Sequence, residues 1–203
     1  MNIVVIDYGM GNIRSIQSSL LYLGVKSVIV SSDRNDILKA DKIILPGVGA
    51  FGEAVREIKK RNLEKHLAEA VLKDGKPILG ICLGMQLLGL SSEEGGFNKG
   101  LNFVNGVVTK LYGEGIKIPH VGFNQIQVNE NSRLYNGLNS EPDFYFTHSF
   151  KMTSEDDIGA SHCVYGSRFV ASFENNNVAG VQFHPELSQN NGLRLLKNFI
   201  ERF

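Results

Sequence analysis

The chain has 203 residues, of which 42% are hydrophobic and 21% are charged, as is usual for a globular protein. Its 21 lysines and arginines equal its 21 aspartates and glutamates, so the formal net charge is zero. This balance argues against a nucleic-acid or membrane-surface partner, because both attract a basic excess. The length fits one domain, residues 1–203, that buries roughly 70% of its unfolded surface.

The N-terminus carries neither a basic leader nor a small-residue cleavage site, and its apolar run is too short to cross a bilayer. The two cysteines, Cys82 and Cys163, lie in different contexts, and nothing indicates a disulfide framework. We therefore expect a cytoplasmic protein.

The first half alternates short apolar runs with helical patterns. We expect strands at residues 3–6, 27–30, 42–45 and 77–81, and helices at 12–23, 33–40 and 52–72. This alternation predicts an α/β fold with a mostly parallel central sheet flanked by helices, joined by right-handed crossovers. Active sites in such sheets lie beyond the carboxyl ends of the strands, so the glycine-rich segments 8–11, 46–49 and 80–84 are expected along one edge.

The second half has a different pattern, with few helices. Strands are expected at residues 102–111, 122–128, 144–151, 170–173 and 178–183, and an amphipathic helix at 191–203. Hairpins follow from the scarcity of helices, so the C-terminal half should add mixed or antiparallel strands. No linker or internal repeat divides the chain.

Cys82 lies in a Gly-x-Cys-x-Gly segment, residues 80–84, at a predicted strand-to-helix junction. This is the cysteine form of the nucleophile elbow, in which a strained turn points the nucleophile out of the sheet. A helix N-terminus there favours a thiolate, and the N–H of Leu83 becomes an oxyanion donor. The alternative is a small buried hydrophobic residue, which is how we interpret Cys163, since it lacks such a turn.

His184 and Glu186 stand two residues apart at the end of an apolar strand, so both side chains are expected on the same face. A cysteine nucleophile needs a base, and the base needs a carboxylate to fix its tautomer. The alternative, a strand-end histidine beside a solvated glutamate, loses weight because of the elbow. The remaining histidines and cysteines assemble no metal-ligand pattern, and no nucleotide-binding loop is present, so neither metal nor cofactor is expected.

Three segments, residues 46–49, 80–86 and 180–186, together resemble class I, triad-type glutamine amidotransferases. Segments 7–12, 119–124 and 145–149 are similar to the glutaminase subunit of imidazole glycerol phosphate synthase. This resemblance runs from the first strand to the last helix. It implies hydrolysis of glutamine to glutamate and ammonia through a Cys82 thioester, with His184 as base and acid and Glu186 orienting it.

The resemblance also implies further site residues. Val48 and Leu83 match the oxyanion positions, and the peptide of Val48 is expected to reorient on activation. The positions that hold glutamine match Gly47, Gly49, Gln86, His148, Ser149 and Phe150. We expect weak glutaminase activity from the isolated chain, rising when its partner holds an acceptor.

The implied partner is a (β/α)8-barrel synthase subunit that forms a heterodimer and receives the ammonia through a channel. In the family it makes imidazole glycerol phosphate and aminoimidazole carboxamide ribotide for histidine biosynthesis. Asn12, Phe123, Asn124 and Tyr145 match stretches that face it. Two positions depart from the family: Leu187 replaces a lysine that reaches an acidic group on the barrel, and Phe123 replaces a tryptophan.

These departures leave open a paralogous subunit that supplies ammonia for amidination of a surface-polysaccharide sugar. A non-catalytic interaction scaffold of the same fold is an alternative of a different class, although an intact triad argues against it. Cysteine hydrolases or chaperones of related sheet families are a further alternative, but they lack the strand-end His-x-Glu pair.

Overall fold

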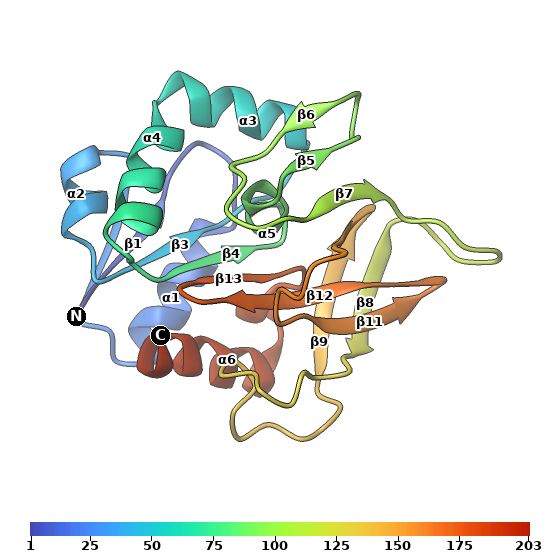
Figure 1. Cartoon of the computed structure of the whole chain (residues 1–203). Coiled ribbons are helices and arrows are strands. Elements are labelled where there is room, and N and C mark those ends of the chain that lie inside the picture. The colour runs from blue at the N-terminus through green and yellow to red at the C-terminus, as the bar shows by residue number, and fades with distance from the viewer.

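The computed structural model describes all 203 residues and is built around a seven-stranded sheet in the order β11-β12-β13-β4-β3-β1-β2 (Figure 1). The strands from β13 to β2 run parallel, whereas β12 and β11 are antiparallel at one edge. Their bounds are β1 Asn2–Ile6, β2 Ser27–Ser31, β3 Lys42–Leu45, β4 Ile78–Ile81, β11 Ser161–Tyr165, β12 Ser167–Asn175 and β13 Val178–Val181. The expected α/β fold is confirmed.

Helices cover both faces of this sheet (Figure 1). On β1, Val4 and Ile6 pack into the core beneath α2 to α5, while Ile3 and Val5 pack with α1 and α6 on the other face. This alternation explains the continuous apolar run, because a strand covered on both faces has no polar side. The helices are α1 Ile13–Tyr22, α2 Arg34–Lys39, α3 Phe51–Lys60, α4 Leu63–Leu67, the π-helix η1 Ala68–Lys73, α5 Leu83–Leu88, the 3-10 helix η2 Pro185–Leu187 and α6 Gln189–Arg202.

Two smaller sheets stand beside the central one. A four-stranded sheet has the order β10-β7-β5-β6, and β8 and β9 form an antiparallel pair in which His120 lies opposite His148. Their bounds are β5 Ser91–Ser92, β6 Asn98–Lys99, β7 Val107–Lys110, β8 His120–Gln125, β9 Asp143–His148 and β10 Phe150–Thr153. The mixed pairing expected of the C-terminal half is therefore present.

Several expected elements differ from the structure. The helix expected at 52–72 is broken at Asn62, whose left-handed backbone (φ 56°) ends α3 and starts α4. The strand expected at 144–151 is two strands, because the chain leaves the pairing with β8 and joins β7 after Ser149. The strand expected at 102–111 is shortened to β7, and β5, β6 and β11 were not expected as strands. No helix has the length and apolar character needed to cross a bilayer.

Candidate active site

Cys82 stands at the carboxyl end of β4, immediately before α5. Its backbone is strained, with φ 54° and ψ −111°, a conformation that an L-residue adopts only where the surroundings enforce it. The flanking glycines allow the turn: a Cβ on Gly80 would lie 2.7 Å from the amide nitrogen of Met85, and one on Gly84 would overlap the carbonyl oxygen of Leu45. Residues 80–84 therefore have the geometry of a nucleophile elbow, as predicted.

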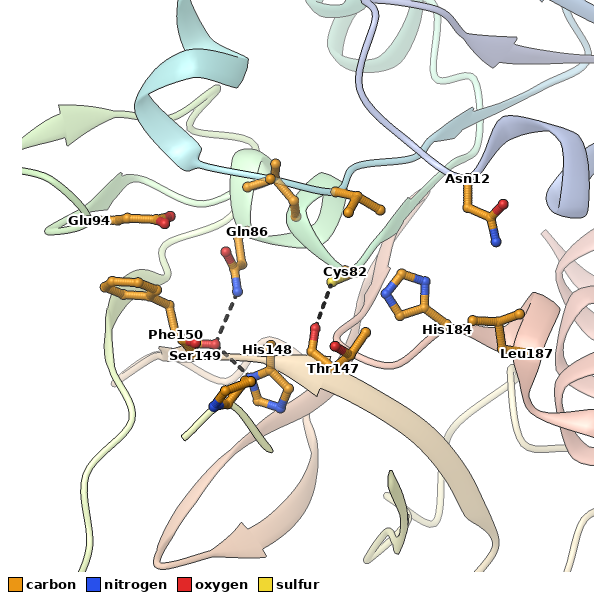
Figure 2. Close-up of a pocket in the computed structure, with 14 residues that line it drawn as sticks. Asn12, Cys82, Gln86, Glu94, Thr147, His148, Ser149, Phe150, His184 and Leu187 are labelled. Atoms are coloured by element: carbon orange, nitrogen blue, oxygen red, sulfur yellow. Dashed lines mark hydrogen bonds between the residues drawn. The ribbon is translucent and has the colours of Figure 1, made fainter. Parts of the chain in front are cut away.

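The sulfur of Cys82 opens into a cavity of about 430 Å³ at the carboxyl edge of the sheet (Figure 2). Most of the predicted oxyanion and glutamine-binding residues line it together with His184, namely Val48, Gly49, Leu83, Gln86, His148, Ser149 and Phe150. Two predicted interface residues, Asn12 and Leu187, line its other end. Gly47, Glu186, Phe123, Asn124 and Tyr145 are not among the lining residues.

His184 and Glu186 form a buried pair. Nδ1 of His184 lies 2.9 Å from Oε1 of Glu186, and their side chains are 4% and 0% exposed. The pair does not arise from strand alternation as expected: β13 ends at Val181, and Glu186 lies in η2, so a tight turn brings the carboxylate back to the ring. Asn12 donates from Nδ2 to the same Oε1 at 3.2 Å and so also holds the carboxylate.

The protonation of His184 is set by its neighbours. Burial lowers its pKa, but Cys82 and Glu186 more than offset burial and raise the pKa to about 10. Nε2 of His184 has no hydrogen-bond partner, and the ring lies beside Cys82 (Figure 2). The arrangement therefore favours an imidazolium beside the sulfur of Cys82, as in activated cysteine nucleophiles.

The segment from Pro46 to Gly49 lies against the elbow. Tyr8 donates from its hydroxyl to the carbonyl of Pro46 at 2.7 Å, and burial raises the pKa of this phenol, so it remains a donor. A Cβ on Gly47 would lie 2.6 Å from the Tyr8 hydroxyl and 2.7 Å from the amide nitrogen of Gly84. Val48 is 49% exposed. Glycine at 47 thus lets the segment that carries Val48 pack closely against the start of α5.

Two of the side chains predicted to hold glutamine support the cavity wall through hydrogen bonds. Nε2 of Gln86 donates to the carbonyl of Phe150 at 3.1 Å, and Nδ1 of His148 lies 2.7 Å from the same oxygen. Burial lowers the pKa of His148 to about 3, so the ring is neutral and Nδ1–H is the donor. Both side chains hold Phe150, and with it the Ser149 backbone, in place.

Residues 4–203 match the family model described as "Glutamine amidotransferase class-I". The chain is 43% identical over 198 residues to "Imidazole glycerol phosphate synthase subunit HisH 1" of Campylobacter jejuni subsp. jejuni serotype O:23/36 (strain 81-176), covering 97% of this chain and 98% of the relative. It is 45% identical over 200 residues to "Imidazole glycerol phosphate synthase subunit HisH" of Aquifex aeolicus (strain VF5), covering 98% and 96%. The chain belongs to the class-I glutamine amidotransferase family, among the HisH subunits.

Solved structures support the same fold. A crystal structure of a glutamine amidotransferase superposes with a TM-score of 0.76 at 17% identity, covering 98% of this chain and 97% of that one. PurLQS from Thermotoga maritima superposes with a TM-score of 0.74 at 21% identity, with 98% and 97% covered. At such identities the likeness concerns the fold alone.

Three residues around the cavity of this amidotransferase were missed by the sequence analysis. Glu94 lines the cavity and accepts from the amide of Phe51 at 2.9 Å, and Thr147 turns its carbonyl toward Cys82, 3.9 Å from the sulfur. Ser188 is buried and bridges the segments carrying the pair: its hydroxyl donates to the carbonyl of His184 at 2.6 Å and accepts from the amide of Tyr145 at 2.9 Å. Nothing local distinguishes these residues from solvated or structural ones.

Of the residues matched to the partner face of the amidotransferase, Asn12 and Leu187 line the cavity, whereas Phe123, Asn124 and Tyr145 lie on the β8–β9 pair. The ring of Phe123, 46% exposed, packs edge-on against Tyr145 with centroids 5.6 Å apart. Asn124 donates to the carbonyl of Val164 at 3.4 Å, and Leu187 is 42% exposed.

The second cysteine, Cys163, lies in the core and is 1% exposed. Burial raises its pKa to about 12, so its thiol remains protonated.

Proposed function

We propose that this chain is a cytoplasmic, single-domain glutaminase subunit of an imidazole glycerol phosphate synthase. It hydrolyses L-glutamine to glutamate and ammonia and passes the ammonia to a (β/α)8-barrel synthase subunit with which it forms a heterodimer. The observation that carries the proposal is the buried His184–Glu186 pair beside Cys82, in a chain that shares 43% identity with a HisH subunit.

In the proposed mechanism the Cys82 thiolate attacks the side-chain carboxamide carbon of glutamine. The N–H groups of Leu83 and Val48 hold the oxyanion, and His184 donates its proton to the leaving nitrogen, so ammonia departs and a thioester remains. Neutral His184 then removes a proton from water, which attacks the thioester and releases glutamate with Cys82 restored. Glu186 keeps the ring of His184 in the tautomer that serves both steps.

Glutamine binding is proposed to use a carboxylate and the backbone at the end of the cavity away from Asn12 and Leu187, where the two groups on the α-carbon would lie together (Figure 2). Glu94 is the carboxylate among the lining residues, and it suits the α-ammonium group of the substrate. The Ser149 and Phe150 backbone, braced by Gln86 and His148, suits the α-carboxylate. Gly49, also on the wall, leaves room for the substrate chain.

The partner is proposed to dock over the mouth of the cavity and across the exposed ring of Phe123. Asn12 and Leu187 line the cavity, and Asn124 and Tyr145 lie with Phe123 on the antiparallel pair of β8 and β9. The acceptor there is a phosphoribosyl-formimino-carboxamide ribonucleotide, and the products are imidazole glycerol phosphate and aminoimidazole carboxamide ribotide. Docking at this mouth would keep ammonia out of water, where protonation removes its nucleophilicity.

A second candidate is a paralogous subunit that supplies ammonia for amidination of a surface-polysaccharide sugar. The observation favouring it is Leu187, an exposed apolar residue where the family carries a lysine that pairs with the barrel. Mixing the chain with each type of synthase partner, and measuring which one stimulates glutamine hydrolysis, separates the two.

Covalent labelling by a glutamine-analogue diazo ketone tests the glutaminase chemistry. We expect labelling of the wild type and of Cys163→Ala, and none of Cys82→Ala. His184→Ala should abolish glutaminase activity. Absence of labelling even with a partner present would establish the non-catalytic scaffold instead.

A further inference from the structure

Gln182 is a completely buried amide that the proposed mechanism does not use. It follows β13 directly, and its side chain reaches the nucleophile, with Nε2 at 3.8 Å from Sγ of Cys82. Its other terminal atom, Oε1, lies 2.9 Å from Nε2 of Gln86. Both contacts are within hydrogen-bond distance, since sulfur is larger than oxygen. The amide therefore links the cavity wall to the reacting sulfur.

The orientation of the Gln182 amide follows from the atoms around it. The carbonyl oxygen of Phe150 can only accept, so the end of Gln86 that lies 3.1 Å from it must be the NH₂ group. An NH₂ group can only donate, so the atom of Gln182 at 2.9 Å from it must be oxygen. The remaining end of Gln182, which faces Cys82, is then the NH₂ group.

The same Phe150 oxygen accepts a second hydrogen bond, which fixes the orientation of the Gln86 and Gln182 amides. Nδ1–H of His148 donates to it at 2.7 Å, and Nε2 of His148 then accepts from Nδ1–H of His120 at 3.1 Å. Burial lowers the pKa of His120 to about 4 and that of His148 to about 3, so both rings are neutral. With both lone pairs of Phe150 occupied, rotating Gln86 would leave buried polar atoms without partners.

We propose that Gln182 donates an N–H group to the Cys82 thiolate and stabilises it before glutamine is attacked. The bond is neutral while Cys82 is a thiol and charge-assisted once the proton has left, so it favours the ionised form. It opposes the carbonyl of Thr147, which lies 3.9 Å from the sulfur and stabilises the S–H form. The inference rests on the proposed function, in which Cys82 is the nucleophile.

The test is the pH dependence of Cys82 alkylation by iodoacetamide, in a Cys163→Ala background without glutamine. We expect Gln182→Leu and the unbranched Gln182→Met to move the midpoint of the rate profile upward by about one pH unit, the loss of one hydrogen bond to a charged group. Gln86→Met, which frees the Gln182 amide to rotate, should move it in the same direction by less. Tyr8, His148, His184 and Glu186, the titratable groups around Cys82, are unchanged in these variants.

A matched control removes a buried amide elsewhere. Asn198 is buried and donates to the carbonyls of Leu134 and Asn136 at 2.8 Å each, so Asn198→Leu should lower the melting temperature and leave the alkylation midpoint unchanged. An unmoved midpoint in a folded Gln182→Leu or Gln182→Met protein would overturn the inference. Since alkylation needs no glutamine, that result is distinct from a failure of diazo ketone labelling, which would overturn the proposed function.

Discussion

The hydroxyl of Tyr8, at the end of the first strand, is bonded at 2.7 Å to the carbonyl of Pro46, at the end of the third. The bond is buried and ends on the segment that carries Val48, which lines the same cavity as Cys82. It ties two neighbouring strand ends together directly behind the proposed oxyanion site.

Replacing Tyr8 by phenylalanine should lower both stability and activity. We expect Tyr8→Phe to lose about 1–2 kcal/mol in the free energy of unfolding, because the buried carbonyl of Pro46 loses its donor. Glutaminase kcat should fall ~10-fold, since the oxyanion donor is held less well. Tyr135→Phe is the control, because it removes a buried 2.8 Å hydrogen bond to Ser172 away from the cavity. This variant should lose a similar amount of stability and keep a normal kcat. Equal kcat losses in the two variants would contradict the prediction.

The raised pKa of His184 predicts a specific pH dependence of stability. The stabilisation that protonated His184 contributes should be fully present below the pKa of its unfolded state, roughly 6.5. It should be lost as pH rises through about 10, because the folded state then no longer holds the extra proton. We expect the unfolding free energy of the wild type relative to His184→Gln to fall by up to about 5 kcal/mol across this window, at about 1.4 kcal/mol for each unit by which the pKa is raised. Denaturant titrations at several pH values measure it.

The contribution of Cys82 to that pKa can be isolated. Cys82→Ala removes the thiolate but keeps Glu186, so the titration midpoint of the His184 ring, followed by NMR, should move down toward its ordinary value. An unchanged midpoint would mean that Glu186 alone sustains the imidazolium.

The elbow predicts that Gly84 tolerates no side chain. Gly84→Ala should cost about 3 kcal/mol or more of stability, because its methyl group would overlap the carbonyl of Leu45, which belongs to a buried strand. Gly75 is the control: it lies just after η1, has φ +70° and faces open space. Gly75→Ala should therefore cost only about 1 kcal/mol, from backbone strain. Thermal unfolding distinguishes the two, and similar costs would argue against the close approach.

Phe123 should matter for the partner and little for folding. Its ring is 46% exposed, so Phe123→Ala should change stability by less than about 1 kcal/mol. The Kd for the synthase subunit should rise ~10-fold or more, as expected when an aromatic interface residue is truncated. Tyr22→Ala, on the exposed end of α1, is the control and should leave the Kd unchanged. A Kd that moves equally in both variants would place the interface elsewhere.

Local sequence predicted those features whose physics is local. The turn at Cys82 needs glycines on either side, the cap at Asp33 accepts from Asn35 at 2.7 Å, and the apolar run of β1 matches a strand buried on both faces. The break at Asn62 was missed because the surrounding residues favour helix and a single left-handed residue interrupts them. The pairing of His184 with Glu186 was predicted, but for a strand geometry that a tight turn replaces.

The amino-acid sequence by itself thus determined the parallel sheet, the elbow and the two residues proposed as the base of Cys82 and its orienting carboxylate, because each depends on residues that are close together in the chain. Only the tertiary structure decided that Glu94 lines the cavity, that Phe150 orders two hydrogen-bond chains and that Gln182 reaches the sulfur. Gln182 and Cys82 are 100 residues apart, and Gln86 and Phe150 are 64 apart. A buried amide acquires a direction from the partners that folding brings to it, and these partners come from distant strands.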